Sequence, residues 1–111
     1  MVDDDPLFRG LARRMLTGMG FAVTGEAEDG ASATVAAQEL RPAAVLLDVW
    51  LPEGHSIELA RELASLPWHP RVVLTSSDPD AVSPAAVAWA GAQGFFPKDE
   101  LPGAPLELLF A

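Results

Sequence analysis

The chain has 111 residues, 50% of them hydrophobic, and a formal net charge of -9. This size and composition fit one folded domain, residues 1–111, and the negative charge disfavours binding to nucleic acid or anionic membranes. The sequence has no cysteine, no apolar stretch of about 20 residues and no signal-peptide pattern, so thiol chemistry is excluded and a cytoplasmic location is expected.

The N-terminal part predicts a helix, a strand and a second helix. Asp5 can cap the first helix, and Pro6 suits its first turn. Apolar residues then recur at helical spacing over 7–16 and again over 33–40. Between them, Phe21–Ala27 contains β-forming residues and precedes an Asp-Gly turn, so we expect a strand there.

The remainder of the chain continues the alternation of strands and helices. Ala43–Leu47 is a continuous apolar run, which is typical of a strand buried on both faces. Further helices are expected over Ile57–Leu66, Pro84–Gly91 and Pro105–Phe110, and further strands over Arg71–Leu74 and Gly94–Pro97. Strands and helices that alternate in this way predict an α/β fold, a parallel sheet covered by helices on both faces.

Polar residues follow several of the apolar runs, at the points where strands should end. These residues are Asp3, Asp4, Asp48, Thr75 and Lys98. Because the carboxyl ends of parallel strands meet at one edge of the sheet, we expect the five side chains to converge there. Three carboxylates, one hydroxyl and one ammonium group suit a hard cation together with a phosphoryl group.

The same residues have simpler interpretations when each is taken alone. An acidic run such as residues 3–5 is usually a solvated turn or a helix cap, and Lys98 alone would be a surface lysine. The convergence of these groups with Asp48 and Thr75 favours a functional site instead, because clustered charges at strand ends usually mark function.

Four segments at these intervals and in this order resemble the receiver domain of response regulators. The similarity extends from Val2 to about Leu109 and rests on Val2–Arg9, Leu46–Pro52, Val73–Ser77 and Gly91–Lys98. The resemblance implies a flavodoxin-like (CheY-like) doubly wound parallel sheet of five strands in the order 2-1-3-4-5. It also implies a phosphoacceptor of two-component signalling with some self-catalysis, rather than an enzyme with an external substrate.

The resemblance assigns roles to the residues around the phosphoacceptor. Asp48 matches the aspartate that receives a phosphoryl group from a histidine kinase or a phosphotransfer protein. Asp3 and Asp4 match the acidic pair that holds Mg²⁺, with Asp4 as the more direct ligand. Asp48 itself and the backbone carbonyl of Trp50 complete the implied metal site.

The remaining assignments concern signalling. Thr75 matches the hydroxyl that bonds a phosphoryl oxygen, Lys98 the ammonium that pairs with it, and Phe95 the aromatic ring whose rotamer reports phosphorylation. A chain of this length leaves no room for a second module, so we expect a stand-alone receiver that signals to a downstream protein. The expected output face comprises the helix up to Gly91, the strand 94–97 and the C-terminal helix. If Trp89 is exposed on this face, it would mark a surface for a partner protein or for a homodimer.

Two alternatives from other functional classes stay open. The first is a receiver-like interaction module that switches without phosphorylation, and an inability to bind Mg²⁺ would favour it. The second is a small phosphohydrolase of the haloacid dehalogenase type. That chemistry needs a second aspartate two residues after the nucleophile, where this chain has Trp50, so we rank it last.

The sequence departs from the receiver pattern at three places. Only Met1 and Val2 precede the acidic pair, so we expect either a first strand that is shortened or exchanged, or a sequence that starts late. Ser56 stands where relatives usually have a loop glycine, eight residues after Asp48. Trp50 is bulky where relatives often have a polar residue, and we hypothesise that it shields an acyl phosphate from water.

Overall fold

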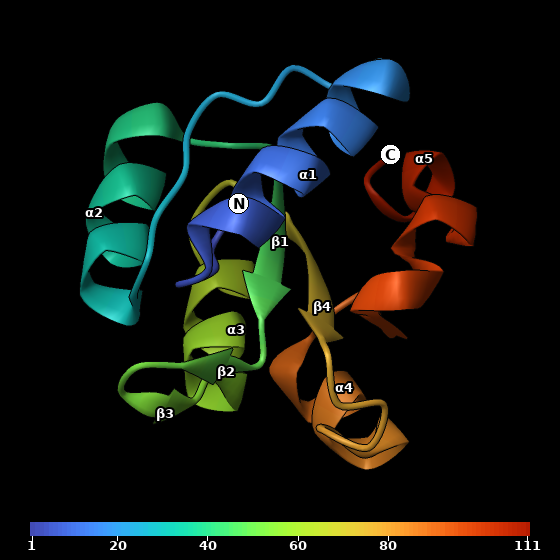
Figure 1. Ribbon diagram of the computed structural model, residues 1–111. Helices are drawn as coiled ribbons and strands as arrows, with labels where there is room; N and C mark the ends of the chain where they lie inside the picture. The colour runs from blue at the N-terminus through green and yellow to red at the C-terminus, as the bar shows by residue number, and fades with distance from the viewer.

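A parallel sheet lies between two layers of helices in the computed structural model, which describes residues 1–111 (Figure 1). Three strands form its ladder in the order β1-β4-β5, with β1 at Ala44–Asp48, β4 at Arg71–Ser76 and β5 at Gly94–Pro97. Val2 extends the sheet beyond β1 through parallel bridges to Leu47 and to Ala27. Across the sheet the order is therefore Ala27, Val2, β1, β4 and β5, which is the predicted order 2-1-3-4-5.

The prediction of a full strand over Phe21–Ala27 is wrong. Only Ala27 bridges to a neighbour, and residues 21–26 have no regular secondary structure. The β-forming residues of this segment lack a partner strand, because the only bridge on this side of the sheet joins Ala27 to Val2. The first and second strands of the expected five-stranded sheet are thus reduced to single bridged residues, and the intrinsic β preference of the segment is overridden by this context.

Two hydrophobic clusters occupy the two faces of the sheet. On one face, α2 (Gly30–Leu40), α3 (Ile57–Ala64) and α4 (Pro84–Ala90) pack against side chains such as Leu47 and Leu74. On the other face lie α1 (Pro6–Gly18), the 3₁₀ helix η1 (Lys98–Gly103) and α5 (Leu106–Leu109), which cover residues that include Leu46 and Val73. Successive strand residues alternate between the two clusters, as the pleat of a strand requires. None of the helices combines the length and the apolar character that a bilayer-spanning segment needs.

Side-chain caps fix the starts of the helices that flank the site. The Asp5 carboxylate accepts a hydrogen bond from the Leu7 N–H (3.0 Å), and the Ser83 hydroxyl accepts one from the Ala86 N–H (3.1 Å). The Asp5 cap was predicted, and both caps satisfy N–H groups that have no partner within the helix. The helix expected over Ile57–Leu66 ends two residues earlier, at Ala64.

A short antiparallel hairpin that the sequence did not predict follows β1 directly. Its strands are β2 (Trp50–Leu51) and β3 (Gly54–His55), and Gly54 adopts a φ of 117°, which favours glycine. The Glu53 carboxylate accepts a hydrogen bond from the Gly30 N–H at the start of α2 (2.5 Å). The hairpin is therefore tied to α2 and stays close to the end of β1.

Candidate functional site

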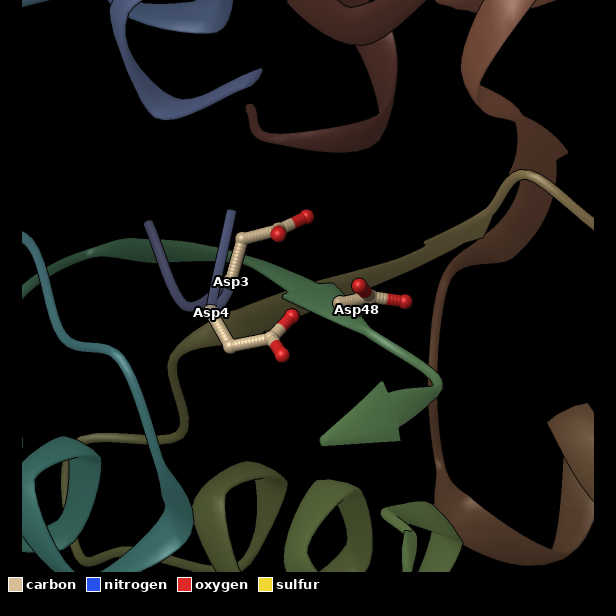
Figure 2. A group of neighbouring side chains, drawn as sticks. All are labelled: Asp3, Asp4 and Asp48. Atoms are coloured by element: carbon tan, nitrogen blue, oxygen red, sulfur yellow. The ribbon is translucent and has the colours of Figure 1, made fainter. Parts of the chain in front are cut away.

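Three carboxyl groups meet at the carboxyl end of β1. Figure 2 shows Asp3 and Asp4 on the N-terminal segment and Asp48 at the end of β1, with their side chains directed towards the same space. One carboxylate oxygen from each residue lies within 4.8 Å of the other two. Asp3 and Asp48 are buried, whereas Asp4 is exposed. The cluster therefore combines two shielded carboxylates with one that solvent can reach.

The only lysine of the chain neutralises part of this charge. The Lys98 Nζ atom lies 2.8 Å from Oδ2 of Asp3 and 3.3 Å from Oδ2 of Asp48. Its position follows from the end of β5, which brings Lys98 to the same edge of the sheet as Asp48. The ammonium group also lies 4.2 Å from the centre of the Phe8 ring, a cation–π distance.

Burial and mutual repulsion change the protonation behaviour of the site. Burial, and after it the negative charge of Asp3, raise the pKa of Asp48 to about 6. Burial acts to lower the pKa of Lys98, but the close contact of its ammonium group with the Asp3 carboxylate and the negative charges of both aspartates outweigh burial, so this pKa is raised. Lys98 therefore stays charged at neutral pH, whereas Asp48 loses its proton only just below neutrality.

Backbone N–H groups hold the two buried carboxyl groups in place, and a hydroxyl group holds the backbone of Asp48. The Asp5 N–H donates to Oδ1 of Asp3 (2.9 Å), and the Trp50 N–H donates to Oδ1 of Asp48 (3.1 Å). The Ser56 hydroxyl donates to the backbone carbonyl of Asp48 (2.6 Å). In each carboxyl group Oδ1 is thus held by the backbone, and Oδ2 faces Lys98.

Thr75 is the direct neighbour of Asp48 in the sheet, but its hydroxyl is engaged elsewhere. The two residues pair in the parallel register of β1 and β4. The buried Thr75 hydroxyl donates to the Phe96 carbonyl on β5 (2.8 Å). Phe95 is partly buried and packs against the cluster under α3 and α4, whereas Phe96 packs against the opposite cluster. A change at Thr75 would therefore act on the backbone of β5, which also carries Phe95.

Trp50 lies at the rim of the site. Its side chain is 49% exposed, and its ring contacts the His55 ring edge-on across the β2–β3 hairpin, with 4.9 Å between the centroids. The His55 Nε2 atom lies 3.1 Å from the Ala81 carbonyl, in the segment between β4 and α4. This hairpin therefore spans from the phosphoacceptor candidate to the loop that follows Thr75.

The sequence prediction located the cluster but missed some of its supports. Asp3, Asp4, Asp48 and Lys98 lie together, and Thr75 lies on the adjacent strand; their roles stay predictions. Arg9 was not singled out, although its Nη1 donates to the backbone carbonyl of Asp3 (2.6 Å). The sequence signals for Arg9 and for the ring of Phe8 were weak. Helical periodicity alone does not show which side chains of a helix turn towards a neighbouring strand.

The donor set fits a hard divalent cation. Mg²⁺ binds oxygen ligands and usually one or two carboxylates. Oδ2 of Asp3 is buried and accepts no well-aligned hydrogen bond, so its only counter-charge is the Lys98 ammonium. A buried carboxylate oxygen without a hydrogen-bond donor carries a desolvation cost that a cation can offset. The acidic cluster of this chain is therefore suited to hold a metal ion.

The family model for the response regulator receiver domain matches residues 1–108. The chain belongs to this family. The match covers nearly the whole sequence and includes every residue of the cluster. It confirms the resemblance on which the sequence prediction rests and, with the strand order above, the CheY-like doubly wound fold. Receiver domains of this family are the signal-receiving parts of two-component response regulators.

Relatives and solved structures agree with this assignment. The chain is 28% identical over 109 residues to the chemotaxis protein CheY of Thermotoga maritima, which covers 98% of this chain and 91% of that protein. It is 37% identical over 101 residues to the response regulator GacA of Pseudomonas protegens, covering 88% of this chain and 46% of GacA. The crystal structure of a LuxR-family two-component response regulator from Aurantimonas sp. superposes with a TM-score of 0.83 at 28% identity, over 96% of this chain and 76% of that one.

These relatives differ in length relative to the chain. It spans about half of several curated relatives, including GacA and the regulator BvgA of Bordetella pertussis (46% and 48% of their lengths), but 91% of CheY. The similarity therefore concerns the receiver domain, which these proteins share.

Proposed function

We propose that this receiver domain accepts a phosphoryl group on Asp48 and passes the signal on by a change in its protein-binding surface. The observation that carries the proposal is the geometry around Asp48: a buried carboxylate with two acidic neighbours within 4.8 Å and the Lys98 ammonium at 3.3 Å. Phosphoryl transfer depends mainly on positioning and on stabilising charge, and these groups can supply both.

Asp3, Asp4, Asp48 and the backbone carbonyl of Trp50 would hold Mg²⁺. When bound, the ion would offset the repulsion between the carboxylate and the incoming phosphoryl group. The backbone N–H groups that engage Oδ1 of Asp3 and of Asp48 keep both side chains oriented. The exposed Asp4 carboxylate can adjust its position, because no hydrogen bond fixes it.

Lys98 supplies the second positive charge. Its ammonium group already lies between Asp3 and Asp48, at 2.8 and 3.3 Å. A phosphoryl group on Asp48 adds about -1.5 to -2 charges and three strong acceptors, which attract the ammonium away from Asp3. Lys98 therefore pairs with the carboxylates in one state and with the phosphoryl group in the other.

Thr75 couples the phosphoryl group to β5. Its hydroxyl must leave the Phe96 carbonyl, which it contacts at 2.8 Å, to donate to a phosphoryl oxygen on Asp48. This exchange frees the Phe96 carbonyl and alters the packing around the partly buried Phe95. One local charge event thus biases a two-state element on the adjacent strand.

The signal would enter from a histidine kinase or a phosphotransfer protein and leave through the face of α4, β5 and α5. Trp89 on α4 is 50% exposed and Leu108 on α5 is 78% exposed, and exposed apolar side chains of this size favour contact with a protein partner. The downstream partner is a second protein or a second copy of the chain. The domain itself acts on no external substrate and only hydrolyses its own phosphoryl group.

Beryllofluoride, a phosphoryl mimic, tests this proposal. With Mg²⁺, fluorine NMR should show bound beryllofluoride on the wild type, no bound signal with Asp48→Asn and a weakened signal with Asp4→Asn. Asp80→Asn is the matched control, because Asp80 is exposed and its carboxyl group makes no hydrogen bond. The absence of any bound signal on the wild type would contradict the proposal and favour a module that switches without phosphorylation.

A further inference from the structure

Three charged side chains form an ionic network beside the acidic cluster, between α1 and the segment before α2. Arg9 and Arg13 lie on consecutive turns of α1, and both donate from Nε to the carboxylate of Glu26. The distances are 3.1 Å from Arg9 to Oε1 and 2.7 Å from Arg13 to Oε2. The hydrogen bond and the charge of Arg13, with smaller contributions from Arg9, lower the pKa of Glu26. Glu26 is therefore charged at neutral pH and holds both guanidinium groups.

Arg9 makes a further contact that Arg13 does not make. Its Nη1 atom donates to the backbone carbonyl of Asp3 at 2.6 Å. The Arg9 side chain is 18% exposed, compared with 45% for Arg13, whose Nη1 atom lies 3.4 Å from the Val23 carbonyl. The planar guanidinium group of Arg9 thus contacts Glu26 and Asp3 at the same time, through two nitrogen atoms whose relative positions are fixed.

The Asp3 carbonyl belongs to the peptide unit that joins the two acidic residues. Asp3 and Asp4 are adjacent on the N-terminal segment, and their side chains are directed towards the same space (Figure 2). The Asp3 N–H donates to the Ala27 carbonyl (3.0 Å), whereas Asp4 makes no backbone hydrogen bond. Because the peptide unit is planar, holding the Asp3 carbonyl also places the Cα atom of Asp4. Arg9 therefore acts on the position of both acidic residues.

We propose that Arg9 is a positioning residue for the metal site: Glu26 holds the guanidinium group, and this group holds the Asp3–Asp4 peptide. The inference rests on the Mg²⁺ site of the proposed function, but it does not depend on phosphorylation. Fixing the peptide between two ligands reduces the entropy that is lost when both carboxylates close on an ion. Groups that orient metal ligands in this way typically change metal affinity by about 10–100-fold.

The charge of Arg9 taken alone has the opposite effect on metal binding. A guanidinium group beside the acidic pair repels a divalent cation, so its removal would tighten Mg²⁺ binding if only charge mattered. The carboxylate of Glu26 offsets part of this charge, because it lies 3.1 Å from Nε of Arg9. Weaker Mg²⁺ binding after the loss of Arg9 is therefore evidence of positioning and not of charge.

Two methionine variants separate positioning from charge. Arg9→Met and Arg13→Met each remove one positive charge and one ion pair with Glu26, but only Arg9→Met removes the donor to the Asp3 carbonyl. The Mg²⁺ dissociation constant is measured from the amide NMR shift of Asp48 at constant ionic strength, and the thermal midpoint without Mg²⁺ reports folding. We expect Arg9→Met to raise the dissociation constant by about tenfold and Arg13→Met to change it by less than about twofold.

Two further variants test the link between Glu26 and Arg9. Glu26→Gln should weaken Mg²⁺ binding more in the wild type than in Arg9→Met, because Glu26 acts through the guanidinium group. Arg9→Lys keeps the charge, but its single ammonium group cannot replace two donors in a fixed geometry, so it should bind Mg²⁺ more weakly than the wild type. Should Arg9→Met not fold, these two variants take its place, and unchanged Mg²⁺ affinity in both would overturn the proposal.

The outcomes for the methionine variants distinguish this inference from the proposed function. Equal dissociation constants for Arg9→Met and Arg13→Met, or tighter binding by Arg9→Met, would overturn the role of Arg9 and leave the proposed Mg²⁺ site intact. A lower thermal midpoint of Arg9→Met with an unchanged dissociation constant would also overturn it, because the network would then only stabilise the fold. A wild type that binds no Mg²⁺ would overturn the metal site and the role of Arg9 together.

Discussion

The ammonium group of Lys98 lies 2.8 Å from Oδ2 of Asp3, closer than it lies to the phosphoacceptor candidate Asp48 (3.3 Å). Asp3 is 2% exposed, so this pair is largely shielded from water. No other lysine is present in the chain, and no other cation contacts these two carboxylates. The stability of the acidic cluster without a metal ion therefore depends on one side chain.

Replacing this side chain should destabilise the protein in a way that Mg²⁺ relieves. Lys98→Gln leaves two buried carboxylates without a counter-charge, so we expect the free energy of unfolding in EDTA to fall by about 2 kcal/mol. Added Mg²⁺ should recover most of this loss. Arg14→Gln removes the same charge from an exposed position of α1 and should do neither. Equal losses in the two variants, measured by urea unfolding, would contradict the role of Lys98.

The raised pKa of Asp48 predicts an unusual dependence of stability on pH. The pKa of this carboxyl group is about 6 in the folded state and near 3.8 in the unfolded chain. The carboxyl group therefore contributes stability only at low pH, and this contribution is lost as the pH rises through 6. Without metal, Asp48→Asn should therefore be more stable than the wild type by about 1–3 kcal/mol at about pH 8 and nearly equal to it at about pH 4.

Urea unfolding at several pH values in EDTA measures this difference. Asp80→Asn serves as the control, because Asp80 is exposed and carries the same formal charge. A stability difference between Asp48→Asn and the wild type that stays constant across this pH range would show that the Asp48 pKa is not raised in the folded protein.

Thr75 should be needed for the switch but not for phosphorylation itself. Thr75→Val keeps the shape of the buried side chain and removes the hydroxyl that contacts the Phe96 carbonyl. We expect Thr75→Val to bind beryllofluoride on Asp48 without the NMR shift changes at Phe95 and Phe96 that the wild type shows. Thr75→Ser retains the hydroxyl and should retain those changes. Full shift changes in Thr75→Val would exclude the hydroxyl as the coupling group.

Trp50 should lengthen the lifetime of the acyl phosphate by limiting the access of water. Replacing it with the smaller and more polar side chain in Trp50→Asn is expected to speed loss of the phosphoryl group several-fold. Trp89→Asn is a close control, because Trp89 has nearly the same exposed fraction (50% against 49%) but lies on α4. Unchanged hydrolysis in Trp50→Asn, followed by mass spectrometry over time, would refute the shielding hypothesis.

The convergence of the cluster could be predicted from the sequence because it depends on a single general rule. Asp48, Thr75 and Lys98 each follow an apolar run, and parallel strands bring such positions to one edge. The direction of the Thr75 hydroxyl towards Phe96, and the preference of Lys98 for Asp3, could not be predicted. They depend on side-chain rotamers and on which neighbours compete for each donor.

The least predictable part of the fold is the edge beside Val2. The residues of Phe21–Ala27 have the composition of a strand, but a strand exists only where a neighbour pairs with it. The β2–β3 hairpin after Asp48 escaped prediction for a different reason. Its strands have two residues each, which is too short for any periodic pattern.

The measurement that tests the central claim most directly is the intact mass of the wild type and of Asp48→Ala after incubation with acetyl phosphate, with and without Mg²⁺. We predict that the wild type gains one phosphoryl group only when Mg²⁺ is present, and that Asp48→Ala gains none. A phosphoryl group on Asp48→Ala, or addition to the wild type that does not require Mg²⁺, would contradict the assignment of Asp48 and the acidic cluster.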